Sequence, residues 1–131
     1  MNPRIKWIVI SAASILCAGA ADAQQPLVNL DTALRCSAAF GIVAAEQQRE
    51  VAAAQRDYPP LALRGREFFV QTGARLMDEQ ALDRAQVQQR LQSEVRKLQA
   101  EISAAPDPAA QTRAVMLPCL TLLDAALPPR R

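Results

Sequence analysis

Residues 82–102 read LDRAQVQQRLQSEVRKLQAEI, and this stretch decides the fold class. Asp83 and Gln86 have the spacing of a capping box, and Leu82 with Val87 has that of a hydrophobic staple. The following faces carry mostly Gln, Arg, Glu and Lys, whereas apolar residues recur at helical intervals: Val87, Leu91, Val95, Leu98 and Ile102. The stretch therefore predicts an amphipathic helix that starts at Asp83 and exposes its polar side to solvent.

Toward the C-terminus, Pro106-Asp107-Pro108 ends this helix and starts another. Asp107 suits an N-cap, and Pro108 suits the first helical position. Residues 115–123 are nearly all apolar, which predicts the most buried segment of the chain. Pro118 lies inside that segment. Because it has no N–H, it should kink the helix and leave the carbonyl group of Ala114 without its usual donor.

Toward the N-terminus, two further helices are predicted on either side of Pro59-Pro60. The first should begin with Asp31 as its N-cap and run to about Arg56. The second should run from Pro60 to about Met77, since proline suits the first turn of a helix. No long stretch alternates between apolar and polar residues in the way a half-buried strand does.

Four helices joined by short connections predict an all-α fold, an antiparallel up-down four-helix bundle. Cys36 lies about five residues into the first helix, and Cys119 lies about eight residues before the end of the last. In an antiparallel arrangement the two positions fall within roughly 6 Å of each other along the axis, at 1.5 Å per residue. We therefore expect a bundle closed by one disulfide, Cys36–Cys119, with its last helix kinked at Pro118.

The first 23 residues have the layout of a secretory signal peptide. Arg4 and Lys6 precede an apolar run, and Ala21-Asp22-Ala23 fits signal peptidase, so we expect a Sec-type signal cleaved before Gln24. The alternatives are a retained membrane anchor and a lipoprotein acylated at Cys17. The expected organisation is a cleavable signal peptide (1–23), a flexible N-terminus (24–30), a helical domain (31–127) and a disordered tail (128–131).

Export to the periplasm, or secretion, also bears on the cysteines. Cleavage would leave 108 residues, enough for one compact domain, and two cysteines that would normally pair in an oxidising compartment. Closing the loop between Cys36 and Cys119 would stabilise the fold by about 4.5 kcal/mol in the chain-entropy model. The alternative is a pair of buried free thiols.

The charge balance argues against two classes of partner. After cleavage, 13 basic and 12 acidic side chains remain, a formal net charge of +1. Nucleic-acid binding needs a dense basic face, so no nucleic-acid partner is expected. Anionic membrane surfaces are equally unsupported, and no stable membrane insertion is expected once the signal is removed.

The sequence supplies few groups for catalysis. It contains no histidine, which is both the commonest general base and the commonest metal ligand. The expected disulfide removes a thiol nucleophile, and no phosphate-binding loop, nucleophile elbow or metal-spaced cysteine set is present. We therefore predict no catalytic residue, no metal ligand and no cofactor, and hence a protein that is not an enzyme.

One segment is unusual in composition, because it places aromatic and charged side chains beside a rigid turn. An aromatic residue flanked by arginines is typical of partner-binding hot spots. The candidate partner-binding residues are Tyr58, Arg64, Arg66, Glu67, Phe68 and Phe69. The alternative is that Tyr58 packs over the turn, both phenylalanines belong to the core and the charges are simply solvated.

Residues Leu82-Asp83-Arg84-Ala85-Gln86 resemble the Leu-Thr-x-x-Gln motif of the periplasmic Spy/CpxP family of helical stress chaperones. The resemblance covers five residues, with Asp83 in the place of threonine, and this chain has no second copy of the motif. It implies a helical periplasmic chaperone.

The residues together favour an exported, non-enzymatic helical protein that binds another protein or peptide in the bacterial periplasm, in envelope stress or as an accessory subunit. One alternative is a carrier of a small ligand or metal, with a cavity lined by Phe68, Phe69, Met77 and Met116. The other is a Spy/CpxP-like chaperone.

Overall fold

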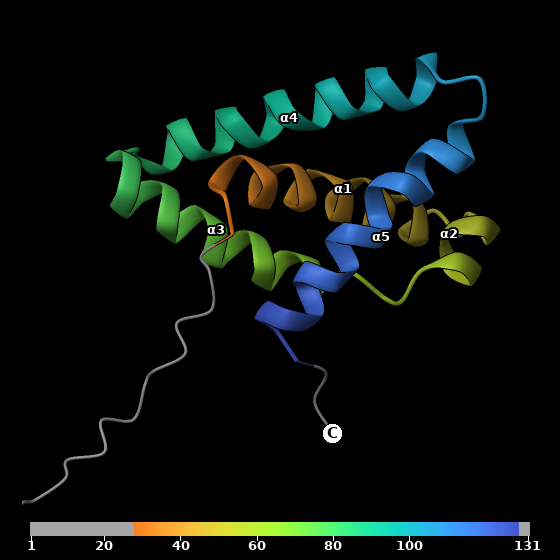
Figure 1. The fold of residues 1–131 in the computed structure, drawn as a ribbon, viewed down its shortest axis with the longest axis horizontal. Helices are drawn as coiled ribbons and strands as arrows, with labels where there is room; N and C mark the ends of the chain where they lie inside the picture. Colours follow the sequence, from red (N-terminus) through yellow and green to blue (C-terminus); the bar gives the residue numbers. More distant parts are fainter. Residues whose placement is uncertain (1–27, 129–131) are drawn as a thin grey trace, which may run out of the picture.

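The computed structural model describes residues 28–128, which form five α-helices and contain no strand (Figure 1). The helices are α1 (Leu30–Gln48), α2 (Ala52–Asp57), α3 (Arg64–Gln80), α4 (Arg84–Ala104) and α5 (Pro108–Ala126). The predicted signal peptide, its cleavage before Gln24 and the last three residues of the predicted tail lie outside the described residues. The all-helical class is confirmed. None of the helices between residues 28 and 128 is long and apolar enough to span a membrane.

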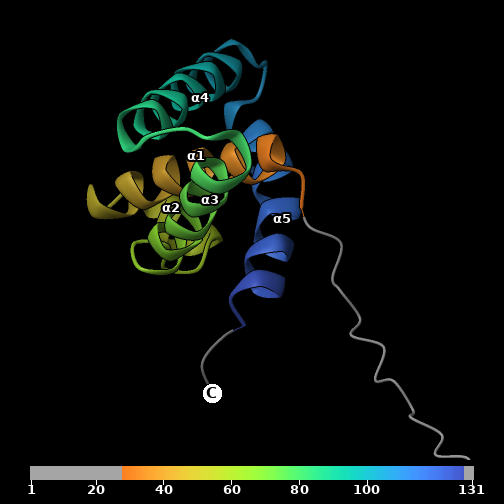
Figure 2. The same cartoon turned by 90° about the vertical axis from the view of Figure 1, so that its left-hand side faces the viewer.

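Helix α1 is the centre of the fold, because it contacts each of the other four helices. Its buried face includes Ala38 and Ala39, whose small side chains let neighbouring helices approach closely. Figures 1 and 2 show α3 and α4 beside α1, whereas α5 crosses it and extends away from α4. The expected N-cap at Asp31 was wrong by two residues. Asn29 caps α1 by accepting hydrogen bonds from the backbone N–H groups of Asp31 and Thr32, at 2.8 and 3.4 Å.

The expected first helix, from Asp31 to about Arg56, is two helices. The chain leaves the helical path after Gln48, and Glu50 takes a left-handed conformation with φ of 60°. Helix α2 then forms a separate helix of 6 residues. Neither glycine nor proline occurs at residues 49–51 to signal this break, and contacts made by Gln47 hold it in place.

The Gln47 side chain organises the whole connection between α1 and α3. Its Nε2 atom donates to the carbonyl oxygens of Ala54 (3.0 Å), Pro59 (2.9 Å) and Tyr58 (3.4 Å). Its Oε1 atom accepts from the N–H of Leu61 at 3.1 Å. One half-buried amide therefore fixes the end of α2 and the proline turn, which otherwise have few backbone partners.

Helix α3 begins at Arg64, four residues later than expected, because residues 62–63 form a turn. Gly65 allows this entry to pack tightly: a Cβ atom there would lie 2.9 Å from the Cβ of Phe40. One turn later, Phe68 packs edge-on against Phe40 in α1, with ring centroids 5.4 Å apart. The helix ends at Ala81, which takes a left-handed conformation with φ of 53°.

The predicted start of α4 is confirmed in detail. Asp83 accepts from the N–H of Gln86 at 2.8 Å, and the Gln86 side chain accepts from the N–H of Asp83 at 2.9 Å. Leu82 and Val87 belong to one hydrophobic cluster, as a staple requires. Only Val87 and Leu98 of this helix are fully buried, so α4 presents most of its surface to solvent.

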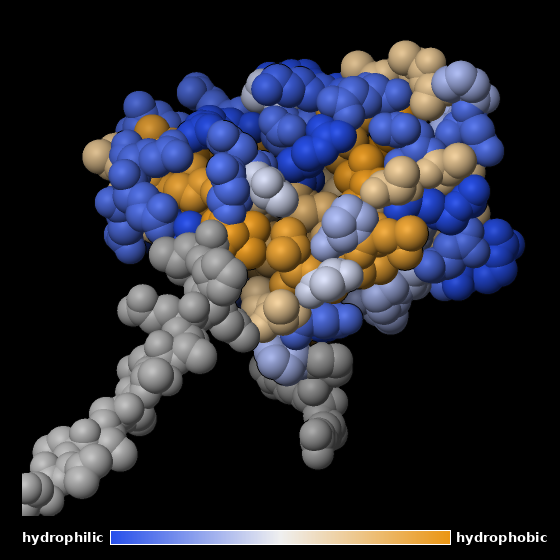
Figure 3. Space-filling model, viewed as in Figure 1, coloured by the Kyte–Doolittle hydropathy of each residue, from blue (hydrophilic) through white to orange (hydrophobic). Residues whose placement is uncertain are grey.

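Helix α5 starts as expected, with Asp107 accepting from the N–H of Ala110 and Pro108 in the first turn. It continues through Pro118 to Ala126. The expectation that residues 115–123 are the most buried segment was wrong for the side of the helix that carries Leu117. Met116, Cys119 and Leu123 are buried, whereas the Leu117 side chain is 66 % exposed. In the view of Figure 3, apolar side chains gather over α5 in the middle of the molecular surface, and polar side chains cover α4.

The predicted disulfide is confirmed: Cys36 of α1 and Cys119 of α5 are bonded, with their Cα atoms 5.2 Å apart. It joins the two helices inside the main core cluster, where both cysteines are buried. The core around it is filled. The space between α1, α4 and α5 beside Met116 amounts to about 10 Å³, no more than one water molecule needs.

Candidate binding site

A mostly apolar groove opens between α1, α3 and α4, and we call it the Phe69 groove. Its volume is about 220 Å³, enough for a large side chain of a partner. The lining residues are Ser37, Phe40, Gly41 and Ala44 of α1, Leu61 and Ala62 just before α3, Gly65, Arg66 and Phe69 of α3, and Leu91 of α4. Arg66 is exposed and supplies its one positive charge.

Gly41 contributes to the open space of the groove. A Cβ atom at Gly41 would meet nothing within 4 Å, so the absence of a side chain there leaves open space. The adjacent phenylalanines take different roles, since neighbouring residues on a helix point about 100° apart. Phe68 is buried against Phe40, and Phe69 is half-buried at the groove.

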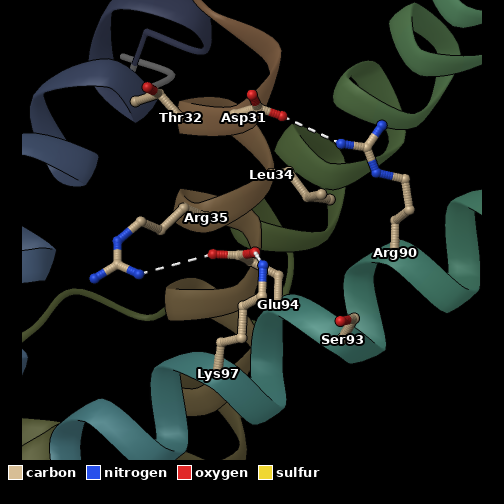
Figure 4. Close-up of a pocket in the computed structure, with 8 residues that line it drawn as sticks. All are labelled: Asp31, Thr32, Leu34, Arg35, Arg90, Ser93, Glu94 and Lys97. Atoms are coloured by element: carbon tan, nitrogen blue, oxygen red, sulfur yellow. Dashed lines mark hydrogen bonds and ion pairs between the residues drawn. The ribbon is translucent and has the colours of Figure 1, made fainter.

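A larger and more polar groove lies between α1 and α4, with a volume of about 500 Å³ (Figure 4). It is lined by Asp31, Thr32, Leu34 and Arg35 of α1 and by Arg90, Ser93, Glu94 and Lys97 of α4. Leu34 is its apolar element and is buried. Every other lining residue carries a charge or a hydroxyl group.

The charges of this polar groove pair with one another across the two helices. Arg35 donates two hydrogen bonds to Glu101, at 3.1 and 2.5 Å, and lies 3.7 Å from Glu94. Arg90 reaches back to Asp31 at 3.2 Å, as Figure 4 shows. Because these opposite charges pair with each other, we interpret the groove as the line of ion pairs that holds α4 against α1.

The Arg35–Glu101 pair shifts the pKa values of both groups. Hydrogen bonding to Glu101 raises the pKa of the Arg35 guanidinium above its ordinary value, against the opposing effect of burial. Hydrogen bonding from Arg35 lowers the pKa of Glu101. Both groups therefore stay charged over the physiological range, and neither is poised to transfer a proton near neutral pH.

Tyr58 lies at a third, separate groove of about 210 Å³, between α2 and the start of α5. Burial raises the pKa of its hydroxyl group, and the nearby charge of Arg113 opposes this effect. Tyr58 is half-buried and packs against the main core cluster. It therefore does not line the Phe69 groove, although both were predicted to belong to one surface.

The other candidate residues also lie on different parts of the surface. Arg64 donates to Asp124 at 2.8 Å and to the carbonyl oxygen of Leu127 at 2.6 Å, so it ties α3 to the end of α5. Glu67 is exposed beside it. Of the six predicted residues, only Arg66 and Phe69 line the same groove, because consecutive residues of one helix face different neighbours.

The residues named for a ligand cavity do not surround one. Met116 is fully buried in the core cluster that contains Phe68, whereas the Met77 side chain is exposed on α3. Within residues 28–128, no three Asp, Glu, Cys or His side chains come together in a way that could hold a metal ion.

Sequence reasoning missed the residues that shape the Phe69 groove, above all Gly41 and Leu91. Gly41 was visible only as one of several small residues in α1, a pattern that equally fits close helix packing. Leu91 was assigned to the apolar face of α4, and it lies where that face meets the groove. A glycine on a helix surface, where nothing packs against it, is the signal that could have identified the site.

Comparison with known proteins adds nothing to what this geometry shows. No protein-family model matches the chain, and neither curated proteins nor solved structures show a significant match.

Proposed function

We propose that this chain is an exported, non-enzymatic helical protein that binds another protein or peptide through the Phe69 groove. One observation carries the proposal. A helix surface has been left without a side chain at Gly41, and the resulting groove is lined by apolar residues with one arginine among them. Apolar pockets with few, well-placed polar groups are typical of recognition sites.

The groove suits a single large apolar anchor from a partner, such as a leucine, methionine or phenylalanine side chain. In many interfaces a few side chains buried in such pockets carry most of the binding energy. Arg66 can contact an acidic residue or a carbonyl group next to the anchor. We therefore expect a short apolar segment with a nearby acidic residue to be the recognised element.

The site of action is part of the same proposal. The leader-like first 23 residues and the Cys36–Cys119 disulfide support the bacterial periplasm or the exterior, because disulfides persist in oxidising compartments. Mass spectrometry of protein from its native envelope tests this. The expected species starts at Gln24 and has no thiol that reacts before reduction, and a species that retains the leader or has free thiols contradicts it.

The groove is tested by filling it. Gly41→Leu places a side chain into the open space, and Gly41→Ala adds one methyl group that meets no neighbour. Alanine should stabilise the helix by up to about 1 kcal/mol. We expect partner capture from envelope extract to be lost with Gly41→Leu and kept with Gly41→Ala, with both variants folded by circular dichroism. Equal capture by both variants rules the groove out.

A second candidate is the Spy/CpxP-like chaperone activity that the motif at residues 82–86 implies. The exposed apolar side chains of Leu63 and Leu117 favour it, because they are 82 % and 66 % exposed and could hold unfolded chains. An aggregation assay with a reduced client protein tests it. Suppression that Leu63→Ser and Leu117→Ser weaken supports this candidate, and no suppression removes it.

The finer topology is also a proposal: an antiparallel up-down four-helix bundle of α1, α3, α4 and α5, with α5 kinked at Pro118. The alternating directions of consecutive long helices in Figure 1 support the topology. The missing N–H of Pro118 inside α5 supports the kink. The helix axes of a crystal structure would test both.

A further inference from the structure

Among residues 28–128, no helix packs on the outward face of α5. The disulfide at Cys119, with Met116 and Leu123, fixes the opposite face in the core. Leu117 therefore points outward, and its side chain is 66 % exposed. Residues 114–123 carry no charge, so the apolar surface continues for nearly three turns of the helix.

Charged residues stand at the two ends of this uncharged stretch, with opposite signs. Arg113 precedes it and Asp124 follows it. At 100° per residue, both fall within about 40° of Leu117 around the helix axis, so all three share one stripe about 16 Å long. Arg113 makes no ion pair within residues 28–128, although it also lines the groove beside Tyr58, and the Asp124 side chain is 58 % exposed although it contacts Arg64.

This stripe is complementary to itself when reversed. If two copies of α5 lie antiparallel about a two-fold axis, Arg113 of each copy faces Asp124 of the other. Leu117 then lies level with Leu120 and next to Thr121 of the second copy, near the centre. Such an arrangement forms both ion pairs with one surface patch, as two-fold symmetric interfaces require. A parallel arrangement would instead place like charges together.

We propose that the outward face of α5, the Arg113–Asp124 stripe, is the docking site of a second copy of this chain. The surface is distinct from the Phe69 groove, which α1, α3 and α4 form. A single pair of helices buries less than the roughly 1,200 Å² of a standard stable interface. The dimer therefore dissociates readily, and its population rises with protein concentration between micromolar and millimolar.

Charge reversal tests the register. Arg113→Glu alone places like charges opposite each other in its own dimer, and Asp124→Arg alone does the same with the opposite sign. When the two variants are mixed, both ion pairs form again in the heterodimer. Sedimentation velocity should show each variant as a monomer alone and a dimer in the mixture. A mixture that stays monomeric, when the wild type dimerises, overturns the antiparallel pairing.

A second pair of variants tests the apolar centre without touching the charges. Leu117→Glu should abolish dimerisation, and the matched control Leu63→Glu changes an even more exposed leucine in the turn before α3 and should leave it intact. We expect at least a tenfold weaker self-association for Leu117→Glu. Wild-type protein that remains monomeric at millimolar concentration, or two variants with equal effects, overturns the proposal. The variant Gly41→Leu should abolish partner capture and leave the dimer intact. The two proposals can therefore fail separately.

Discussion

Replacing Gln47 by alanine should destabilise the protein more than any other single change to an exposed or half-buried polar residue. The substitution removes three well-formed hydrogen bonds, two to the carbonyl oxygens of Ala54 and Pro59 and one from the N–H of Leu61. Each contributes about 1 kcal/mol, and water can replace part of the loss because the site is half-buried. We expect the free energy of unfolding to fall by about 2 kcal/mol.

For a domain of this size, that loss lowers Tm by about 8–16 °C. Circular dichroism at 222 nm during thermal and guanidinium unfolding measures it, with the disulfide intact in every sample. Gln55→Ala is the matched control, because Gln55 is exposed and makes one long bond of 3.5 Å to the Gln47 carbonyl oxygen. Its effect should stay within about 0.5 kcal/mol. Equal, small effects of the two variants would refute the role given to Gln47.

Gln47→Glu sharpens the test through its pH dependence. A carboxylate would keep the acceptor for the N–H of Leu61 but would face three carbonyl oxygens in place of a donor. This repulsion raises the pKa of the new carboxyl group in the folded state. The stability of the Gln47→Glu variant relative to the wild type is therefore highest below the pKa of the carboxyl group in the unfolded state, about 4.3. It is lost as pH rises through the higher pKa of the folded state. A difference that does not change with pH contradicts the geometry.

Three further predictions concern other contacts in the structure. Replacing Cys36 and Cys119 by serine should cost about 4.5 kcal/mol, read as the shift in guanidinium midpoint multiplied by the m-value. Gly65→Ala should destabilise by about 1–3 kcal/mol in the same assay, because its Cβ would lie 2.9 Å from that of Phe40. The pKa of Glu101 is lowered, so the stability from its ion pair is present above the unfolded pKa and lost as pH falls through the folded value. Glu101→Gln should therefore flatten the acid limb of stability against pH.

The sequence predicted those features that depend on neighbouring residues. The capping box of Asp83 and Gln86 and the Asp107 cap of α5 involve residues three positions apart, so the pattern itself contains both partners. The disulfide was also predictable, because positions on two helices that were assumed to be antiparallel could be compared by length alone.

The break between α1 and α2 could not be predicted, because its cause lies elsewhere in the chain. Gln47 reaches residues 7 to 14 positions away, and no glycine or proline marks the turn. Local propensity favours a continuous helix there, and tertiary hydrogen bonds override it. The start of α3 was misplaced for the same reason.

The candidate surface was only partly predictable. A run of aromatic and charged residues identifies an unusual segment, but it does not show which side each residue faces once the helices pack. Phe68 and Phe69 are adjacent in sequence, yet one fills the core and the other lines a groove. Leu117 shows the converse, since an apolar segment can be buried on one face only.

The crosslink between the first and last helices makes most of the chain a covalent ring, with 83 positions separating its two cysteines. A translocase that pulls on either end can draw in only the segment outside the ring before it meets the crosslink. To continue, its channel must admit two strands side by side, or the bond must first be reduced. Translocases with narrow channels should therefore stall on the oxidised protein and process the reduced form freely.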